Sequence, residues 1–356
     1  MALLTKNVFI DTQVFCNLAL DFSAKNIISF EELCQKGELS HVTNTVVVQE
    51  VRKKILEFII DGLKGIESFQ RRCGFLKNDK GIADKLFPEI SEYELKEKGY
   101  SDFQDFLEAS NAKIIDMKKV EGNEILEIFF KQARPFGLGK KTEFRDAFSL
   151  LSLRSHLKRG EKMYVVSLDG DHKAFCSAHE QFIHVESLNS LLDICYKHID
   201  ERSKFVEKFL IEKKEDIIIA LKNQIENAEG YNASTWEDAE VDEFRVTEIG
   251  EFEPDITHLD NDGCRINFNV TVKIEVDVIG PDTASGRYDR EDDILYTFED
   301  TQRKEEEEHD FSVEIDLTFE ADEGGFINED FELAVEGLTK GIEFGVEEYP
   351  WEDPRM

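Results

Sequence analysis

The first half of the chain alternates short apolar runs with stretches of helical periodicity. The apolar runs fall within 7–12, 42–44, 112–117, 164–168 and 182–185. Helical stretches lie between them, such as the long segment that starts at Thr45, its predicted cap. Strands that alternate with helices predict an α/β fold, with a doubly wound, mainly parallel sheet flanked by helices.

The second half begins with helical periodicity and then changes to a period of two. One amphipathic helix is predicted over 201–228, followed by a polar and acidic linker. Apolar residues then alternate with polar ones, most clearly over 266–278 and 311–319. This pattern predicts an antiparallel, β-rich (α+β) domain whose sheet has one apolar and one acidic face. The acidic run 305–308 is expected to be a loop or tail feature.

The chain has 356 residues, which is enough for two domains. The α/β domain is predicted over 1–200, and the charged stretch 61–110 reads as a helical insertion within it. The long helix and the linker occupy 201–243. The smaller acidic domain follows over 244–346, and 347–356 form a tail.

Charge separates the two halves as clearly as periodicity does. The chain has 43 Lys and Arg against 77 Asp and Glu, with a net of −3 over 1–200 and −31 over 201–356. This balance excludes a polybasic protein held on nucleic acid by bulk charge, but not an enzyme that grips nucleic acid through metal ions. The acidic domain either shields the first domain, docks a basic partner or mediates self-association, or only keeps a β-rich module soluble.

The cysteines and the hydropathy indicate the compartment. The six cysteines have no zinc-site spacing, so they read as buried thiols in a reducing environment. Lys6 and Asp11 interrupt the N-terminus before a signal-peptide core could form, and no stretch approaches the length of a membrane span. We therefore expect a cytoplasmic protein without membrane partners.

Five acidic residues end the predicted strands or lie near the starts of the predicted helices in the first half. They are Asp11, Glu50, Asp146, Asp169 and Asp171. Taken singly, most are ordinary helix-start or surface acids. However, the carboxyl ends of parallel strands face one crevice, so these side chains should converge. Clustered carboxylates need a counter-cation, and oxygen ligands favour Mg²⁺ or Mn²⁺, ions that promote phosphoryl chemistry.

Four segments that carry these acids resemble the PIN-domain nucleases in order and context. They are FIDT at Asp11, VVVQEV at Glu50, FRDAFSLLSL at Asp146, and VVSLDGDH at Asp169 and Asp171. The resemblance covers roughly residues 5–190 and is closest to larger members with an added C-terminal domain. It implies a metal-dependent endonuclease, usually for RNA, that leaves a 3′-hydroxyl and a 5′-phosphate. A toxin-like or defence role would also be consistent with the family.

The resemblance also implies a role for each acid. Asp11 and Asp169 are expected to bind the metal directly or through water, and Asp146 to complete the site. Glu50 either binds the metal or positions the attacking water. These four form the expected catalytic set. Asp171 either holds a second ion or only caps the following helix.

Other polar residues near these acids are candidate substrate contacts. Two hydroxyls, Thr12 and Ser167, could contact phosphate or support the metal ligands. The basic residues next to Asp146 form either a phosphate-positioning patch or a solvated loop; they are Arg134, Lys140, Lys141 and Arg145. Five further basic residues could extend the patch, although solvated helix faces are the simpler interpretation; they are Arg52, Lys53, Lys54, Arg71 and Arg72.

The first-choice function is a divalent-metal-dependent endonuclease that hydrolyses phosphodiester bonds, with RNA favoured over DNA. One alternative is a catalytically silent PIN scaffold whose acidic domain recruits a partner. Another is a structure-specific DNase in which 61–110 forms an arch. His172 beside Asp171 suggests an acid/base pair, but a structural histidine on a turn is the favoured interpretation.

Overall fold

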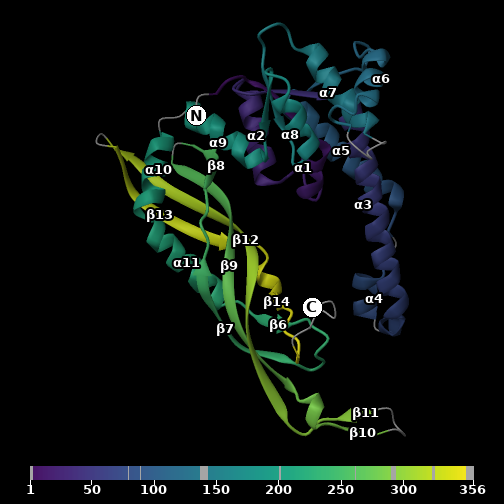
Figure 1. Ribbon diagram of the computed structural model, residues 1–356, viewed down its shortest axis with the longest axis vertical. Helices are drawn as coiled ribbons and strands as arrows, with labels where there is room; N and C mark the ends of the chain where they lie inside the picture. The colour runs from purple at the N-terminus through teal and green to yellow at the C-terminus, as the bar shows by residue number, and fades with distance from the viewer. Residues whose placement is uncertain are drawn as a thin grey trace. The chain divides into compact units, whose positions relative to one another are not determined.

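The computed structural model describes residues 3–78, 80–88, 90–136, 143–199, 202–260, 262–289, 294–322 and 325–349. The chain divides into two compact units, Met1–Ile199 and Asp200–Met356. Each unit is considered by itself (Figure 1). Among the described residues, no helix has both the length and the apolar character needed to cross a membrane.

A five-stranded parallel sheet forms the centre of the first unit, in the order β3-β2-β1-β4-β5. Its strands are β1 (Asn7–Ile10), β2 (Ser40–Asn44), β3 (Lys113–Ile115), β4 (Met163–Val166) and β5 (Phe182–Val185). Every neighbouring pair is parallel. The side chains of β4 are buried along its whole length, as expected for a strand covered on both faces. The predicted doubly wound α/β fold is confirmed.

The chain order of the strands reverses between β1 and β4. From β1 the chain moves outward to β2 and β3, and it later returns to β4 on the other side of β1 and continues to β5. The connections on the two sides of this point diverge, which leaves a crevice at the carboxyl ends of β1 and β4. The local geometry therefore places a site next to Asp11 and Ser167, the residues that follow these strands.

Helices cover the sheet and carry the remaining site residues. They are α1 (Thr12–Asn17), α2 (Lys25–Gln35), α3 (Thr45–Arg72), α4 (Lys80–Leu86), α5 (Glu92–Ala109), α6 (Gly122–Phe130), α7 (Phe144–His156), α8 (Gly170–Ser177) and α9 (Leu188–Ile199), with a 3₁₀ turn, η1, at Gly74–Asn78. Aromatic rings join α1, α2 and α5: Phe106 contacts Phe15 and Phe30, at centroid distances of 5.4 Å and 6.4 Å. The last turns of α5, although predicted as part of an insertion, therefore belong to the core.

Asn44, rather than the predicted Thr45, caps α3. Its Oδ1 accepts a hydrogen bond from the Val47 amide at 3.0 Å, and its Nδ2 donates to Ser149 Oγ at 2.8 Å. The side chain is fully buried. An amide carries its acceptor and its donors on separate atoms, so Asn44 satisfies the helix start through Oδ1 and ties it to α7 through Nδ2.

The helix α3 continues far beyond the layers of the core. It has 28 residues, and Figure 1 shows its distal half projecting from the sheet with α4 at its far end. Phe69 and Phe87 lie 6.4 Å apart between ring centroids, and Gln70 Nε2 donates to the Leu86 carbonyl. No described residue between 61 and 88 is buried. We call residues 61–88 the arm.

The second unit is built on an antiparallel sheet in the order β13-β12-β9-β7, with β8 also paired to β9. These strands are β7 (Glu240–Ile249), β8 (Asp255–Leu259), β9 (Gly263–Pro281), β12 (Asp300–Asp322) and β13 (Gly325–Val335). The short elements are β6 (Gly230–Asn232), β10 (Arg287–Asp289), β11 (Ile294–Tyr296), β14 (Ile342–Phe344), η2 (Thr283–Ser285) and η3 (Leu338–Lys340). The predicted antiparallel domain is confirmed.

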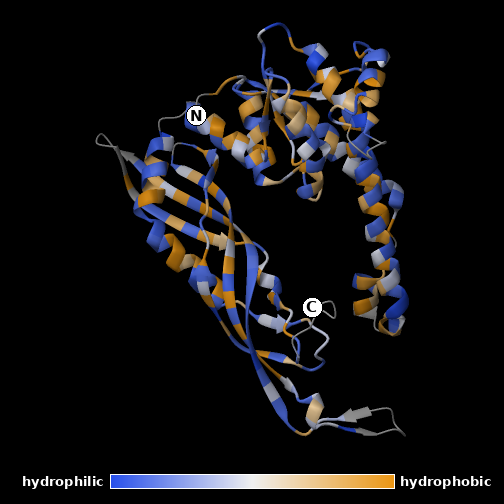
Figure 2. Cartoon of the chain, viewed as in Figure 1, coloured by the Kyte–Doolittle hydropathy of each residue, from blue (hydrophilic) through white to orange (hydrophobic). Residues whose placement is uncertain are grey.

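Hydrophobic and polar residues alternate along β9 and β12, as the banding in Figure 2 shows. Ile266 and Ile274 are buried on the apolar face. Two helices, α10 (Arg202–Glu212) and α11 (Lys214–Glu226), bury their own apolar residues, and Gln224 Oε1 accepts a hydrogen bond from the β13 amide of Val335 at 3.2 Å. The opposite face carries acidic residues such as Glu314 and Asp316.

Three details of the second unit differ from the sequence-based prediction. The single helix predicted over 201–228 is interrupted at Lys213, whose φ of −99° and ψ of 9° start a new helix without any Gly or Pro. The predicted linker 229–243 contains β6 and the first residues of β7. The acidic run 305–308 lies inside β12, where Glu308 is opposite Lys273. Pairing with β9 and a basic neighbour therefore outweigh the low strand propensity of glutamate.

Candidate active site

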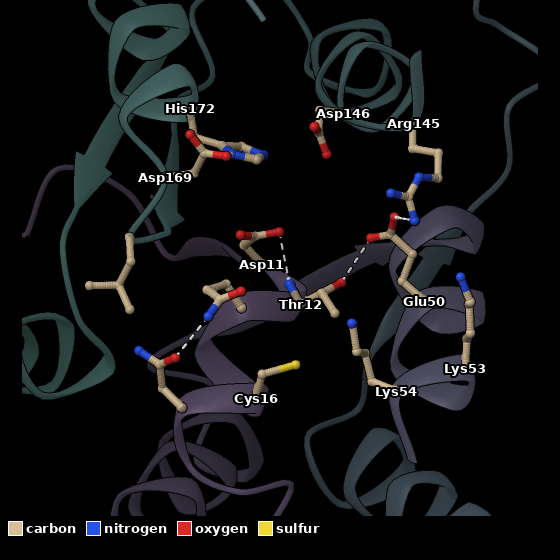
Figure 3. Close-up of a pocket in the computed structure, with 13 residues that line it drawn as sticks. Asp11, Thr12, Cys16, Glu50, Lys53, Lys54, Arg145, Asp146, Asp169 and His172 are labelled. Carbon is tan, nitrogen blue, oxygen red and sulfur yellow. Dashed lines mark hydrogen bonds and ion pairs between the residues drawn. The ribbon is translucent and has the colours of Figure 1, made fainter. Parts of the chain in front are cut away.

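A cavity of about 540 Å³ opens where the strand order reverses. Segments from α1, α3, α7 and the start of α8 line it, and Figure 3 shows their side chains pointing toward one space. The lining residues are Asp11, Thr12, Gln13, Cys16, Asn17, Glu50, Lys53, Lys54, Arg145, Asp146, Leu168, Asp169 and His172. Four of the five predicted acids are therefore brought to one cavity from four separate parts of the chain.

Asp11 sits at the centre of the site, directly after β1. It caps α1, because its Oδ1 accepts the Thr12 amide at 2.8 Å, and its Oδ2 accepts a hydrogen bond from Ser167 Oγ at 3.1 Å. Ser167 Oγ in turn accepts the Asp169 amide at 3.1 Å. Asp11 is only 9% exposed. These hydrogen bonds hold its carboxylate in one orientation and link it to Asp169 through Ser167.

Glu50 lies in the second turn of α3 and faces α1 and α7. Its Oε2 accepts a hydrogen bond from Thr12 Oγ1 at 3.1 Å, and its Oε1 pairs with Arg145 Nη1 at 2.9 Å. Two of the predicted substrate contacts, Thr12 and Arg145, thus have a first role in positioning this carboxylate. Because Arg145 remains 66% exposed, its other N–H groups are accessible to a ligand.

Asp146, in the first turn of α7, is the most perturbed acid of the site. Burial raises the pKa of its carboxyl from 3.8 to about 8, assisted by a hydrogen bond with Glu143 and by the negative charges of Glu143, Glu50 and Asp11. Burial, together with the neighbouring carboxylates, therefore disfavours the ionised form of Asp146. Such an environment favours binding of either a proton or a metal cation at this carboxylate.

Asp169 and Asp171 begin α8 but have different surroundings. Asp169 caps the helix, since its Oδ1 accepts the Asp171 amide at 2.7 Å, and it lines the cavity. Asp171 is buried, forms an ion pair with Arg134, and is not among the described residues that line the cavity. The structure thus separates Asp171 from the other four acids and gives it a structural partner.

The family comparison agrees with this arrangement. Residues 8–172 match the family model described as the PIN domain. This part of the chain is a PIN domain. PIN domains are generally nucleases, which indicates a nuclease-type function for the first unit. The match does not extend to the acidic unit, and no curated protein or solved structure matches the chain.

The basic side of the PIN domain cavity differs in part from the sequence-based prediction. Lys140 and Lys141 lie outside the described residues, and Arg134 pairs with Asp171. Lys53 and Lys54, for which a solvated helix face is the simpler interpretation, keep much of their side-chain surface exposed and also line the cavity. Their spacing of three and four residues from Glu50 was the available signal, because such residues share one face of a helix.

Other lining residues were missed or differently interpreted. Gln13, Cys16 and Asn17 come from α1, and nothing in their sequence pattern distinguishes them from other helix residues. His172 was expected to be structural, yet it lines the cavity while only 2% exposed. Its Nδ1 is buried 3.9 Å from Asp169 Oδ2, and no hydrogen-bond partner for it exists among the described residues. A buried polar atom without a partner points to a role beyond packing.

The donor set of the PIN domain suits a divalent cation, although its described residues form no preformed metal centre. Among the described residues, no three His, Cys, Asp or Glu side chains are close enough together to hold an ion as they stand. The available donors are nevertheless carboxylate oxygens, which Mg²⁺ and Mn²⁺ prefer. Burial and the neighbouring carboxylates raise the pKa of Asp146, so the ionised form of this carboxyl is disfavoured. Small side-chain movements toward an ion would relieve that repulsion.

Proposed function

We propose that the PIN domain is a Mg²⁺- or Mn²⁺-dependent endonuclease that hydrolyses phosphodiester bonds, with RNA favoured over DNA. The observation that carries the proposal is the convergence of four carboxylates on the cavity at the strand-order reversal; they are Asp11, Glu50, Asp146 and Asp169. The nuclease-type function of the family supports it. The preference for RNA rests on the family resemblance, so the test compares substrates.

Asp11, Asp146 and Asp169 are the proposed metal-holding residues. A bound divalent ion would polarise the phosphate and lower the pKa of a bound water. Thr12 and Ser167 already orient the Asp11 carboxylate, so little free energy is needed to order this side chain when a metal ion binds. Glu50 can position the attacking water, because Thr12 and Arg145 hold its two oxygens in place.

The basic residues of the cavity are proposed to hold the phosphate backbone. Lys53, Lys54 and Arg145 line the side of the cavity that Glu50 occupies, as Figure 3 shows. Their positive charges oppose the repulsion between the carboxylates and a phosphodiester. Hydrolysis adds water across one P–O bond, and the family pattern gives a 5′-phosphate and a 3′-hydroxyl as the ends.

Cleavage assays test the proposal directly. Labelled single-stranded RNA, single-stranded DNA and duplex DNA are incubated with Mg²⁺, Mn²⁺ or EDTA. The full-length protein, Asp146→Asn and the control Asp116→Asn, an exposed aspartate after β3, are compared. We expect EDTA-sensitive cleavage, strongest on RNA, that Asp146→Asn abolishes and Asp116→Asn retains. Cleavage that survives in Asp146→Asn would refute the site, and absence of cleavage on every substrate would favour the silent scaffold.

A further inference from the structure

One side of α3 carries cations and aromatic rings from the cavity to the last turn of the helix. The side chains concerned are Lys53, Lys54, Phe58, Lys64, Phe69, Arg71 and Arg72, which we call the α3 stripe. We propose that the α3 stripe binds single-stranded nucleic acid and holds the part of the substrate that extends beyond the cavity. This inference rests on the proposed nuclease function and specifies how its substrate is gripped.

Helix geometry places the cations of the α3 stripe on one side. At about 100° per residue, Lys53, Lys64 and Arg71 fall within about 20° of one another. Lys54 and Arg72 are separated by five turns and share a second direction, so that all five cations occupy an arc of about 100°. At about 1.5 Å per residue, the line from Lys53 to Arg72 is about 28 Å long. A stacked strand with a spacing of about 3.4 Å would place about eight nucleotides along it.

The α3 stripe begins at the proposed reaction site. Lys53 and Lys54 line the cavity one turn after Glu50. A strand whose scissile phosphate lies among the carboxylates would therefore meet these lysines first. From there the helix leads away from the sheet, as Figure 1 shows, and Arg71 and Arg72 lie in its last turn. Continuity with the cavity favours a nucleic acid over an unrelated acidic protein as the ligand.

Aromatic rings accompany the cations. Phe58 is 46% exposed and follows Lys54 by four residues, while Phe69 is 39% exposed and precedes Arg72 by three. Residues at these spacings are neighbours on a helix surface. Proteins that bind single strands combine a positively charged path with aromatic faces on which bases stack. The α3 stripe offers both, and bases in a duplex would not be available to these rings.

Acidic residues within the arc reduce the positive charge of the α3 stripe but do not cancel it. Glu57 pairs with Lys53 and Lys54 at 3.4 Å and 2.8 Å, and Asp61 pairs with Lys64 at 2.9 Å. Exposed pairs of this kind contribute little and can exchange for a phosphate. Arg71 and Arg72 have no ion-pair partner among the described residues.

A purely structural explanation exists for this last pair. Cations in the last turn of a helix interact favourably with its dipole, which would account for Arg71 and Arg72 but not for binding. The helix dipole does not explain the exposed Phe58 or the two lysines at the cavity. A dipole role predicts a loss of helix stability on substitution, and no change in the affinity for nucleic acid.

The test measures binding without cleavage. Full-length Asp146→Asn protein in EDTA is titrated against fluorescent single-stranded RNA of about 4 and about 12 nucleotides, shorter and longer than the α3 stripe. In that background, Arg71→Gln/Arg72→Gln is compared with Lys158→Gln/Arg159→Gln, an exposed basic pair after α7. Circular dichroism checks that each protein is folded, and Arg71→Lys/Arg72→Lys tests whether charge alone suffices.

We expect Arg71→Gln/Arg72→Gln to weaken binding of the longer RNA on the order of tenfold at low salt. The slope of log K against log salt should fall by about 1.4, as for two lost phosphate contacts on a single strand. Arg71→Lys/Arg72→Lys should restore the slope. Phe58→Ala should lower the affinity for the longer RNA and leave the slope unchanged. The shorter RNA and the Lys158/Arg159 control should be unaffected.

Three results would overturn the proposal. Equal losses of RNA affinity in Arg71→Gln/Arg72→Gln and in the Lys158/Arg159 control would show a general charge effect. Equal losses of affinity for both RNA lengths would show that the effect does not depend on an RNA long enough to reach the end of the α3 stripe. Binding of polyglutamate with the same dependence on Arg71 and Arg72 would assign the α3 stripe to an acidic protein. Binding of RNA that does not depend on Arg71 and Arg72 refutes the α3 stripe, and so does failure to bind either RNA. The nuclease function requires a metal ion and is judged separately, by the cleavage assay with Mg²⁺ or Mn²⁺.

Discussion

Arg145 Nη1 lies 2.9 Å from Glu50 Oε1, so a cation on α7 neutralises the cavity carboxylate of α3. The same negative charge of Glu50 contributes to the raised pKa of Asp146, the residue after Arg145. Arg145 is therefore placed to moderate the field that a metal ion would experience. Its exposed position at the cavity also makes it available to phosphate.

Arg145→Gln should separate metal binding from substrate binding. With Glu50 unpaired, the cavity becomes more negative, so the affinity for Mn²⁺ should rise a few-fold. The affinity for RNA should fall, because a phosphate contact is lost. Isothermal titration with Mn²⁺ and anisotropy with RNA measure the two effects. A parallel fall in both affinities would indicate that Arg145 only maintains the structure of the site.

Asp146 should make the metal-free protein less stable as the pH rises. Its pKa is about 8 in the folded protein against 3.8 for the ordinary carboxyl. The stability that it contributes is therefore fully present below pH 3.8 and is lost as the pH rises through 8. In EDTA, Asp146→Asn should exceed the wild type in free energy of unfolding by on the order of 1 kcal/mol near pH 8, after allowing for solvent screening.

Thermal or urea unfolding at several pH values measures this difference. Asp116→Asn serves as the control, because hydrogen bonds from Lys118 lower the pKa of that exposed carboxyl and keep it ionised over this pH range. Added Mn²⁺ should reverse the order and stabilise the wild type more than Asp146→Asn. A wild type that gains stability between pH 5 and 8 relative to Asp146→Asn in EDTA would contradict the assigned protonation.

Binding of Mn²⁺ should tighten as the pH rises toward 8. The ion must displace the proton that Asp146 holds below that pH. The apparent affinity should increase by up to about tenfold per pH unit and level off above the pKa. Titration of the full-length protein at constant ionic strength measures this dependence. An affinity that is independent of pH between 6 and 8 would show that Asp146 does not contact the ion.

Asn44→Ala should be far more destabilising than loss of an ordinary cap. It removes the hydrogen bond to the Val47 amide and leaves the buried Ser149 and Ser152 hydroxyls without the Asn44 amide donor. We expect a loss of about 2–4 kcal/mol in the free energy of unfolding. Ser91→Ala, at the exposed start of α5, should cost about 1 kcal/mol. Similar losses in the two variants, measured by urea unfolding, would show that Asn44 acts only as a cap.

The sequence was most informative where a residue's position along a strand determines its position in space. Asp11 directly follows a buried strand and Asp169 lies just beyond another, so strand order alone brings them to one crevice. The side chains of Gln13 and Asn17 reach the same cavity only because α1 folds back beside it, and no periodicity reports that packing. Asp171 was grouped with the cavity acids, but the first turn of α8 directs it to Arg134.

The differences in the second unit have a related cause. Lys213 begins a new helix although neither a glycine nor a proline marks the break, so local propensity gave no warning. The acidic run 305–308 is a strand because β9 pairs with it from a distant part of the chain. Local composition does not contain that partner. Long-range pairing, rather than local propensity, determined these elements.

Because α3 is one uninterrupted helix, it fixes the distance between Glu50 and Arg72. In the proposed complex, the number of helical turns in α3 sets the distance from the scissile bond to Arg71 and Arg72, and no flexible loop contributes to it. A four-residue insertion after Asp61 would lengthen this interval by about 6 Å and keep Arg71 and Arg72 on nearly the same side. A two-residue insertion would instead turn them away by about 200°. Under the proposed function, the shortest RNA bound both at the cavity and at Arg71 and Arg72 would lengthen with the first insertion, and binding at both places would be lost with the second.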